Sequence, residues 1–376
     1  MRLLITGGGT GGHVYPALSV LEAWNPPPTL LWVGKQGGME AEILRRAGLP
    51  YQGIRAGGLN STRWNRRLLH SLMLVQGFGE AWQILRRFKP DVVFATGGYV
   101  TGPVGLAARL QRVPIVIYLP DIRPGLAVKA LAPLATRVAV TTPRSADFFG
   151  DKAVVTGYPV RKALTEPRSR AAARGTFGIN EADRLLLVMG GSSGAHNLNV
   201  AIGENLARLL PLTRIIHLYG KSDEAWLMAQ KAALPDELRD RYQPFSYLHD
   251  EMADALLAAD LIVARAGASV LGELPAAKLP AVLVPLPIAG VGQDENAAWL
   301  VERGGAAQLD DDAALPTTLP ALLATLLNDE ATLQRMAAAM AAAAPPNAAA
   351  RIVALLQQCA TANANNGQPR KSEVAP

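Results

Sequence analysis

Cysteine and histidine are both scarce in this chain. Its 376 residues include one cysteine, Cys359, and five histidines that show no metal-ligand spacing. A single cysteine excludes an internal disulfide framework and a metal site built from several thiolates. We therefore expect neither a bound metal nor an internal disulfide.

Long apolar runs and dense basic tracts are also missing. No apolar stretch reaches the roughly 18 residues that a membrane-spanning helix needs. The N-terminal apolar run is too short for a secretory signal and turns into glycine, which favours a cytoplasmic protein. Because no Lys/Arg tract is interleaved with aromatic residues, nucleic acid is the weakest candidate partner.

What the chain does contain is ample apolar material and a positive net charge. Hydrophobic residues make up 49% of the chain and charged residues 18%, proportions typical of a globular protein. A length of 376 residues favours about two domains. The net charge of +6 suits an anionic partner, such as phosphate groups or an acidic membrane surface.

The most informative stretch is a glycine-rich loop near the N-terminus. The short apolar run Arg2–Ile5 predicts a buried strand, five glycines follow within residues 7–12, and an apolar helical pattern begins at Ala17. Glycines let backbone N–H groups approach a ligand, and the dipole of the following helix favours negative charge there. The loop ends at His13, a titratable group suited to acid–base chemistry.

Four interpretations of this loop are open. The pattern Gly7-x-Gly9-x-x-Gly12 fits the dinucleotide fingerprint, but Gly34–Gly37, which follows the second predicted strand Thr29–Val33, carries no acidic residue for a ribose. A phosphate-binding P-loop would need Gly-Lys-Ser/Thr, which is absent. A nucleotide-sugar glycosyltransferase whose acceptor phosphates meet the loop is the third interpretation. The fourth is a tight turn without a ligand.

Strands and helices alternate along the rest of the chain, which favours parallel sheets with helices on both faces. A second apolar strand, Arg184–Met189, runs into the glycine loop Gly190–Gly194 and then a helix, which predicts a second Rossmann-like domain. A nucleotide would fit the cleft between the two domains. The predicted strands after the first are 29–33, 91–95, 114–119, 137–140, 153–156, 184–189, 213–219, 261–264 and 281–284.

An apolar stripe lies within residues 66–89. Arginines precede the stripe, and Arg86, Arg87 and Lys89 follow it. Such a stripe either covers a sheet or docks, with its cationic rim, on an anionic membrane face, and a half-covered helix would do both. The residues of this predicted membrane patch are Leu68, Leu72, Val75, Phe78 and Trp82.

Residues 263–273 predict a nucleotide site. A strand ends at Ala264, a small-residue turn follows, and Ser269 begins a helix with Glu273 in about its first turn. That carboxylate can accept hydrogen bonds from ribose hydroxyls while N–H groups of the turn hold a diphosphate; alternatively, it only complements the helix dipole. Further on, the Gln293 amide suits sugar hydroxyls, or is simply a solvated loop residue.

Five motifs, in order between residues 2 and 355, resemble the MurG family of peptidoglycan UDP-GlcNAc transferases. They are Thr10–Pro16, Thr96–Pro103, Gly157–Arg161, Gly190–Ala195 and Arg265–Glu273. The resemblance implies an α/β protein of the GT-B type, with two Rossmann-like domains whose parallel sheets face each other across a cleft. It also implies an inverting transferase that needs neither a metal nor another cofactor.

The resemblance and the composition together suggest four segments. Residues 1–158 are expected to form an acceptor domain on the membrane side, and 159–343 a domain that binds the UDP-sugar. Residues 346–359 are expected to form a helix that packs back on the N-terminal domain. Residues 361–376 are polar and without an apolar period, which predicts a disordered tail.

The implied reaction moves GlcNAc from UDP-GlcNAc to the 4-hydroxyl of undecaprenyl-diphosphate-linked MurNAc-pentapeptide, the step from lipid I to lipid II in peptidoglycan synthesis. Such an enzyme serves cell-wall biogenesis, cell shape and cell division, as a peripheral protein on the cytoplasmic, anionic face of the inner membrane. Two other classes stay open. One is another GT-B enzyme, such as a glycolipid transferase or a UDP-GlcNAc epimerase, and the other is a non-catalytic scaffold that binds a UDP-sugar.

Site residues follow from the resemblance position by position. The general base is expected at His13, with Asp121 as the second choice; alternatively, His13 only binds acceptor phosphate. The implied UDP-GlcNAc-binding residues are Thr10, Gly11, Gly12, Asp121, Arg161, Ser192, His249, Ala268, Ser269, Val270, Leu271, Gly272, Glu273 and Gln293.

The chain departs from the family pattern in two places. The family usually has His-Glu-Gln-Asn after the strand that ends near Ile117, where this chain has Tyr118-Leu119-Pro120-Asp121. A glutamate at the position of Leu119 therefore cannot be the base here. The usual Asp-His before the glutamine is replaced by Val291-Gly292, which removes two polar side chains from this loop.

Overall fold

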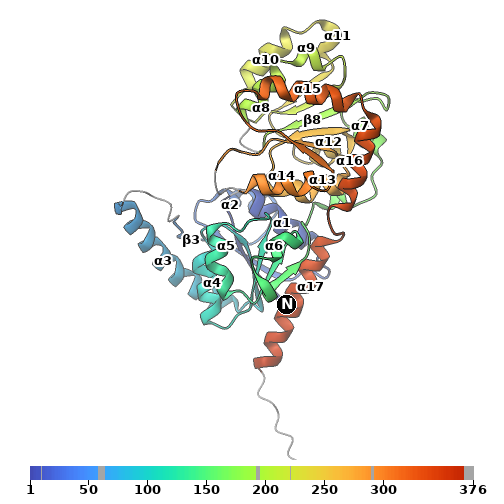
Figure 1. Ribbon diagram of the computed structural model, residues 1–376. Helices are drawn as coiled ribbons and strands as arrows, with labels where there is room; N and C mark the ends of the chain where they lie inside the picture. The colour runs from blue at the N-terminus through green and yellow to red at the C-terminus, as the bar shows by residue number, and fades with distance from the viewer. Residues whose placement is uncertain (10, 58–63, 192–194, 221, 289–291, 368–376) are drawn as a thin grey trace, which may run out of the picture. The chain divides into compact units, whose positions relative to one another are not determined.

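The computed structural model describes residues 1–9, 11–57, 64–191, 195–220, 222–288 and 292–367, with residues 64–72 and 365–367 described as backbone only. The chain divides into two compact units (Figure 1). The first unit is Met1–Pro159 together with the described residues from Pro346 on, and the second unit is Val160–Pro345.

The first unit is built on a seven-stranded parallel sheet with the strand order β3-β2-β1-β4-β5-β6-β7. In the central strand β1, Leu4 is paired with Leu31 on one side and Val93 on the other. The order reverses direction at β1, which is the point where ligands of doubly wound sheets bind. The strands are β1 (Arg2–Gly7), β2 (Thr29–Lys35), β3 (Tyr51–Ile54), β4 (Val92–Gly97), β5 (Ile115–Leu119), β6 (Arg137–Val140) and β7 (Ala153–Val155).

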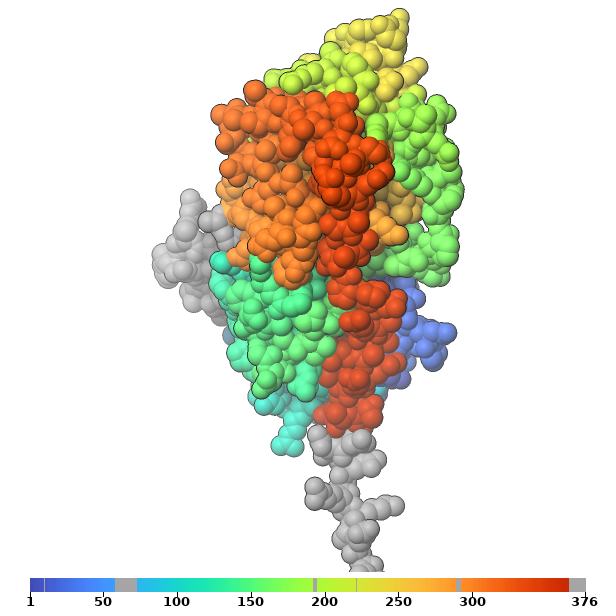
Figure 2. Space-filling view, turned by 45° about the vertical axis from the view of Figure 1, so that its right-hand side comes forward, coloured from blue at the N-terminus to red at the C-terminus, as the bar shows by residue number. Residues whose placement is uncertain are grey.

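Apolar residues on both faces of this sheet are buried, as expected for a parallel sheet covered by helices. On one face, strand residues such as Val93 and Ile117 pack with Ile84 and Val104 of two neighbouring helices. Figure 2 shows the C-terminal helix α17 lying on the surface of this unit, and α17 contacts α1, β4 and β5. The helices are α1 (Gly11–Glu22), α2 (Met39–Arg46), α3 (Trp64–Phe88), α4 (Thr101–Leu110), α5 (Leu126–Leu131), α6 (Pro143–Ala146) and α17 (Ala348–Gly367), with short 3-10 turns at Ala132–Leu134 and Gly150–Lys152.

The second unit repeats the design with a six-stranded parallel sheet in the order β10-β9-β8-β11-β12-β13. Its strands are β8 (Leu185–Met189), β9 (Arg214–Leu218), β10 (Tyr242–Phe245), β11 (Leu261–Ala264), β12 (Ala281–Leu283) and β13 (Ala306–Gln308). Its helices are α7 (Arg170–Gly175), α8 (His196–Gly203), α9 (Leu206–Leu209), α10 (Glu224–Ala232), α11 (Asp236–Arg239), α12 (Met252–Ala258), α13 (Glu273–Ala277), α14 (Gln293–Val301), α15 (Leu315–Leu327) and α16 (Glu330–Ala342), with 3-10 turns η3 (Lys162–Leu164) and η4 (Ala268–Leu271). The two parallel sheets confirm the predicted class of two Rossmann-like domains.

Two expectations need correction. Helix α17 continues to Gly367, so the disordered tail predicted from Thr361 is wrong for residues 361–367, where alanines favour the helix; residues 368–376 lie outside the described part. Three short strands, β3, β10 and β13, were not predicted, because each contains Gln, and two also Gly or Pro, in place of a continuous apolar run. Equally short but fully apolar strands such as β7 were predicted. Across the described residues, no helix combines the length and the apolarity needed to cross a membrane.

Candidate functional site

Three loops meet at the carboxyl edge of the first sheet. Strand β4 lies between β1 and β5, so the loops that follow these three strands are neighbours. They carry the glycine loop after Gly7, the second glycine turn at Gly97 and Gly98, and Asp121 after β5. The switch in strand order therefore brings together the residues that the motifs singled out in this half of the chain.

The two glycine turns pack directly against each other. The N–H group of Gly8 donates to the carbonyl oxygen of Gly97 over 3.2 Å. A Cβ atom on Gly98 would lie 2.5 Å from the carbonyl oxygen of Gly8, and one on Gly97 would lie 2.8 Å from Nε2 of His13. Both Gly97 and Gly98 also have positive φ angles, so these positions require glycine for space and for conformation.

His13 is held by the glycine loop. It lies half-buried in the first turn of α1, and its Nδ1 is 2.9 Å from the carbonyl oxygen of Gly8. A carbonyl oxygen only accepts hydrogen bonds, so Nδ1 carries the proton of that bond. In the neutral ring, Nε2 then holds the lone pair, which is the arrangement that a general base needs.

The amide groups of Gly11 and Gly12 lie at the N-terminus of α1. The first N–H groups of a helix have no intrahelical acceptor, and the helix dipole makes this end positive. Helix α1 begins at Gly11, ahead of the apolar helical pattern that the sequence shows from Ala17, because glycine is a poor helix former and gives no helical signal. Thr10, predicted to act with these glycines, lies outside the described residues.

The departure from the family pattern has a structural explanation. Leu119 is the last residue of β5 and is buried in the core of the first unit, so this position offers no acid–base group. Tyr118 is also fully buried, with its hydroxyl 3.1 Å from Oγ1 of Thr141, and burial raises its pKa well above the ordinary tyrosine value. Asp121 is half-buried in the loop beyond, and its backbone carbonyl accepts a hydrogen bond from Ser145 over 3.4 Å.

In the second unit, Arg161 and Glu273 form an ion pair. Nη2 and Nε of Arg161 lie 3.2 and 3.3 Å from Oε1 of Glu273, and both side chains are partly buried. The helix does not begin at Ser269 as predicted. Residues Ala268–Leu271 form a 3-10 turn instead, and Glu273 is the first residue of α13. Glu273 thus lies at the positive end of a helix and beside a guanidinium, so the dipole interpretation and the ligand interpretation both fit.

The turn that leads to Glu273 is anchored on both sides. The guanidinium of Arg265 pairs with the buried carboxylate of Asp311 over 2.7 Å and donates to the carbonyl oxygen of Val284 over 3.1 Å. The side chain of Asn296 donates to the carbonyl oxygen of Ala266 over 3.0 Å. Arg265 and Asn296 therefore fix the conformation of the turn. Buried residues follow at Val270 and Leu271 within η4 and at Gly272 directly after it.

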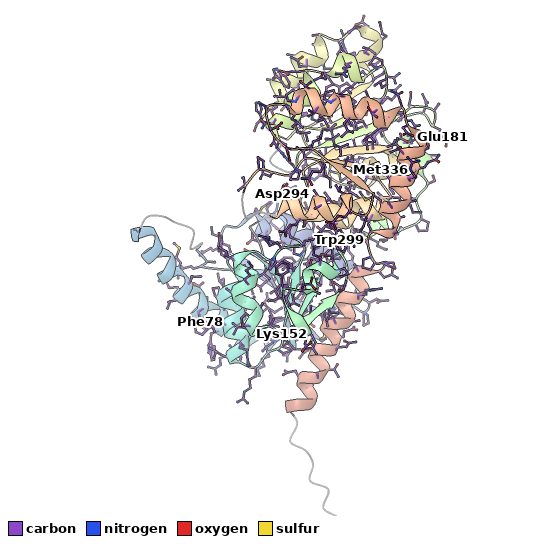
Figure 3. The ribbon with its side chains drawn as sticks, in the orientation of Figure 1. Phe78, Lys152, Glu181, Asp294, Trp299 and Met336 are labelled. Atoms are coloured by element: carbon purple, nitrogen blue, oxygen red, sulfur yellow. The ribbon has the colours of Figure 1, made fainter. Side chains whose placement is uncertain are left out.

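Gln293 is the first residue of α14, next to Asp294, which Figure 3 labels at one end of that helix with Trp299 farther along. The side-chain amide oxygen of Gln293 accepts a hydrogen bond from the N–H group of Leu286 over 2.9 Å. The NH2 group of the same amide is therefore the part that suits a sugar oxygen. His249 is exposed after β10, with its ring 4.7 Å from that of Tyr247.

Two groups of predicted residues are only partly described. Ser192 lies outside the described residues, as do the side chains of Leu68 and Leu72. Of the remaining patch residues on α3, Val75 is 70% exposed, whereas Phe78 and Trp82 are half-buried against the core with ring centroids 5.9 Å apart. In the described ranges, no three His, Cys, Asp or Glu side chains are grouped as a metal site would need.

Sequence reasoning missed Glu40, the second residue of α2. Its side chain is fully buried, and its two carboxylate oxygens accept the backbone N–H groups of Gly9 and Lys35. The signal in the sequence is slight: a glutamate among Gly34, Gly37 and Gly38 reads as an ordinary acid in the first turn of a helix. Nothing in the sequence shows that its carboxylate reaches the glycine loop.

Comparison with known proteins assigns both halves of the chain. The model of the glycosyltransferase family 28 N-terminal domain matches residues 3–140, and that of the family 28 C-terminal domain matches residues 185–352. A UDP-N-acetylglucosamine–N-acetylmuramyl-(pentapeptide) pyrophosphoryl-undecaprenol N-acetylglucosamine transferase of Roseiflexus sp. (strain RS-1) is 41% identical over 375 residues, covering 85% of each chain. A protein of the same name from Symbiobacterium thermophilum is 39% identical over 338 residues, covering 88% of this chain and 89% of the relative.

Solved structures agree with these matches. The crystal structure of Acinetobacter baumannii MurG superposes with a TM-score of 0.77 at 30% identity, covering 95% of this chain and 99% of that one. A UDP-GlcNAc 2-epimerase from Neisseria meningitidis superposes with a TM-score of 0.67 at 16% identity, over 95% and 100% of the two chains, which shows a shared fold alone. Since both domain models match and relatives of about 40% identity extend over most of both sequences, the chain belongs to glycosyltransferase family 28 and, within it, to the MurG family.

Proposed function

We propose that this chain transfers GlcNAc from UDP-GlcNAc to the 4-hydroxyl of undecaprenyl-diphosphate-linked MurNAc-pentapeptide, which converts lipid I to lipid II. The observation that carries the proposal is the named activity of relatives that are 39–41% identical over at least 85% of this chain. Two local features support it: the Arg161–Glu273 pair beside η4 in one unit, and His13 on a glycine loop in the other.

In this proposal the second unit holds the donor. Glu273 accepts hydrogen bonds from the ribose hydroxyls. The N–H groups of Ala268 and Ser269 at the start of η4 face the diphosphate together with Arg161, since those of Val270 and Gly272 already donate within the turn. As the glycosidic bond breaks, negative charge grows on the departing UDP. The fixed positive groups of Arg161 and the helix start stabilise that charge, because they are already oriented before the reaction. Gln293 orients the sugar and His249 lies near the uracil. Ser192 belongs to the loop that faces the diphosphate.

The first unit binds the acceptor substrate and supplies the general base. The acceptor 4-hydroxyl attacks the anomeric carbon from the face opposite UDP, so the new C–O bond forms as the bond to the phosphate oxygen breaks and the configuration inverts. Nε2 of His13 takes the hydroxyl proton, because its Nδ1–H is committed to the carbonyl oxygen of Gly8. Asp121 is the second candidate for this role. Thr10, Gly11 and Gly12 contact substrate phosphates at the start of α1.

We also propose that the protein binds the cytoplasmic face of the inner membrane as a peripheral protein. The exposed side chain of Val75 and the half-buried Phe78 on α3 offer an apolar contact, and exposed Arg86 and Arg87 follow on the same helix. Apolar insertion and attraction to anionic lipid headgroups would then add to one another.

The test is release of UDP by the purified protein with UDP-GlcNAc and a lipid-linked MurNAc-pentapeptide analogue. We expect release that requires the acceptor and that is faster with UDP-GlcNAc than with UDP-glucose or UDP-GalNAc. Binding of UDP-GlcNAc without any acceptor-dependent release would instead favour a scaffold or a different acceptor. Conversion of the donor without a lipid would favour an epimerase.

A further inference from the structure

The carboxylate of Glu40 lies beneath the glycine loop and contacts two separate segments. Oε2 accepts the N–H group of Gly9 over 3.1 Å, and Oε1 accepts the N–H group of Lys35 over 2.7 Å. Glu40 itself is completely buried. One side chain from α2 therefore ties the loop after β1 to the end of β2.

Three glycines surround this carboxylate. A Cβ atom would lie 2.3 Å from Oε1 of Glu40 if placed on Gly8, 2.4 Å if placed on Gly38 and 2.9 Å if placed on Gly34. These distances are far below van der Waals contact, and the obstacle is a buried group that cannot swing into solvent. These three positions therefore require glycine because any larger residue would collide with the buried carboxylate of Glu40.

Helix-dipole complementation does not account for Glu40. Glu42 lies in the same first turn of α2, and its exposed carboxylate pairs with Arg45 and Arg46 over 2.8 and 2.9 Å. An acid that serves only the dipole stays in solvent, as Glu42 does, because burying a carboxylate is costly unless hydrogen bonds compensate. Both oxygens of Glu40 accept a backbone N–H group outside α2.

The bond to Gly9 has a consequence for what the loop can bind. In a dinucleotide fingerprint the second glycine, here Gly9, lets the backbone approach the pyrophosphate. In this chain the amide of Gly9 already donates to Glu40, and the indole of Trp32 donates to the carbonyl oxygen of Gly7 over 3.0 Å. The strand side of the loop is thus occupied internally, which leaves the start of α1, with the amides of Gly11 and Gly12, as the side for a phosphate.

We infer that Glu40 is a positioning residue for the transfer reaction. Its buried carboxylate accepts the N–H group of Gly9 on the strand side of the glycine loop. It thereby holds the Gly8–Gly9 peptide group, whose carbonyl oxygen binds His13. A substrate phosphate is then directed to the amides of Gly11 and Gly12 at the start of α1. This inference rests on the proposed function, since it assumes that the loop meets the acceptor.

The test compares Glu40→Gln and Glu40→Asp with Glu42→Gln, a control on the same turn. In Glu40→Gln an NH2 group replaces one oxygen, so one of the two backbone N–H donors faces another donor. Glu40→Asp keeps the charge but is one methylene shorter, so it reaches fewer of its partners. Three quantities are measured in the full chain: hydrogen exchange at Gly9 and Lys35, the Kd for UDP-GlcNAc without acceptor, and kcat/KM for the acceptor analogue.

For Glu40→Gln we expect faster exchange at Gly9 or Lys35 and a fall in acceptor kcat/KM of about tenfold or more, as for one lost hydrogen bond to a charged group. The Kd for UDP-GlcNAc should change by less than the acceptor kcat/KM, because most of the proposed donor-binding residues, from Arg161 to Gln293, belong to the second unit. Glu40→Asp should recover part of the loss, and Glu42→Gln should match the wild type.

Wild-type exchange and kinetics in Glu40→Gln would overturn the inference. So would faster exchange without a change in kcat/KM, or an equal loss of UDP-GlcNAc affinity. If Glu40→Gln does not fold, a folded Glu40→Asp with wild-type kcat/KM and exchange is the contrary result. The exchange measurement needs no substrate, so it still tests the contact of Glu40 with the loop if the wild type shows no acceptor-dependent UDP release and the proposed function fails.

Discussion

Acidification should weaken the second unit through one buried histidine, His217. Its ring is completely buried in β9, where Nδ1 lies 2.9 Å from the hydroxyl of Tyr242 and Nε2 lies 3.0 Å from Oδ1 of Asn199. The Asn199 amide NH2 donates to Asp223 over 2.6 Å, which fixes Oδ1 as the acceptor for Nε2–H. The network therefore suits a neutral imidazole. Burial lowers the pKa of His217 from 6.5 to about 3, and the nearby Asp223 charge only partly opposes this.

The sign and size of the effect follow from proton linkage. Between pH 6.5 and about 3, His217 is neutral in the folded protein but protonated in the unfolded chain, so the unfolded state binds the additional proton. The free energy of unfolding therefore falls as pH falls, by about 1.4 kcal/mol per pH unit once the pH is below the unfolded pKa. From pH 7 to pH 5 this amounts to about 2 kcal/mol, or a fall in Tm of about 4–8 °C for a unit of this size.

Urea unfolding at pH 7 and pH 5 of the wild type and of His217→Gln tests this value. Glutamine keeps a hydrogen-bond donor and an acceptor but fits the buried site less well, so the variant should be less stable at pH 7. Because glutamine does not titrate, the free energy of unfolding of the variant should fall by about 2 kcal/mol less than that of the wild type between pH 7 and pH 5. The comparison between the two proteins removes the contribution of other titrating groups. Parallel pH dependence in the two proteins would refute the assignment of this effect to His217.

Three further outcomes are expected. Both His13→Gln and His13→Ala should lower kcat at saturating substrates by about 10²–10⁴-fold if Nε2 is the base, and retention of most of the rate by either variant would exclude that role. Glu273→Gln should raise the KM for UDP-GlcNAc by about tenfold or more, since it weakens charge-assisted bonds to the ribose, while an unchanged KM would leave Glu273 a helix-dipole residue. Val75→Ser should weaken sedimentation with anionic liposomes at unchanged Tm, because Val75 is exposed. Phe78→Ser should weaken sedimentation as well and also lower Tm, because Phe78 packs against the core. Unchanged sedimentation of both variants would end the membrane proposal for α3.

The sequence was most informative where apolar runs and glycines coincide. Apolar strands such as Arg2–Gly7 and Leu185–Met189, each followed by a glycine loop, were enough to predict two parallel sheets and the edge at which their ligand loops lie. Edge strands such as Ala306–Gln308 escaped prediction, because they lack the β-branched apolar run that marks the equally short edge strand Ala153–Val155. The end of α17 was misjudged, since composition alone did not show that the helix would continue beyond Thr361.

Residues of the candidate site were predictable where they belong to a local sequence motif. Contacts between residues that are far apart in the sequence were not predictable. Arg161 and Glu273 are 112 residues apart, and the motifs proposed both without indicating that they pair with each other. Leu119 was recognised as a departure, but only the structure shows that it has become part of the core. Glu40 was missed because its role depends on burial and on three glycines from separate segments, which no local pattern reports.

The return of the chain to its first unit has a consequence for how the protein is made. The first unit consists of Met1–Pro159 and the segment from Pro346, and α17 supplies Ile352 and Leu356, both completely buried. During synthesis, the site for α17 beside α1 and β4 therefore stays uncovered until the whole second unit and the last helix have left the ribosome. A fragment that stops at Pro159 would keep this apolar surface in water. An N-terminal unit that folds by itself would need residues 346–367 joined back to it.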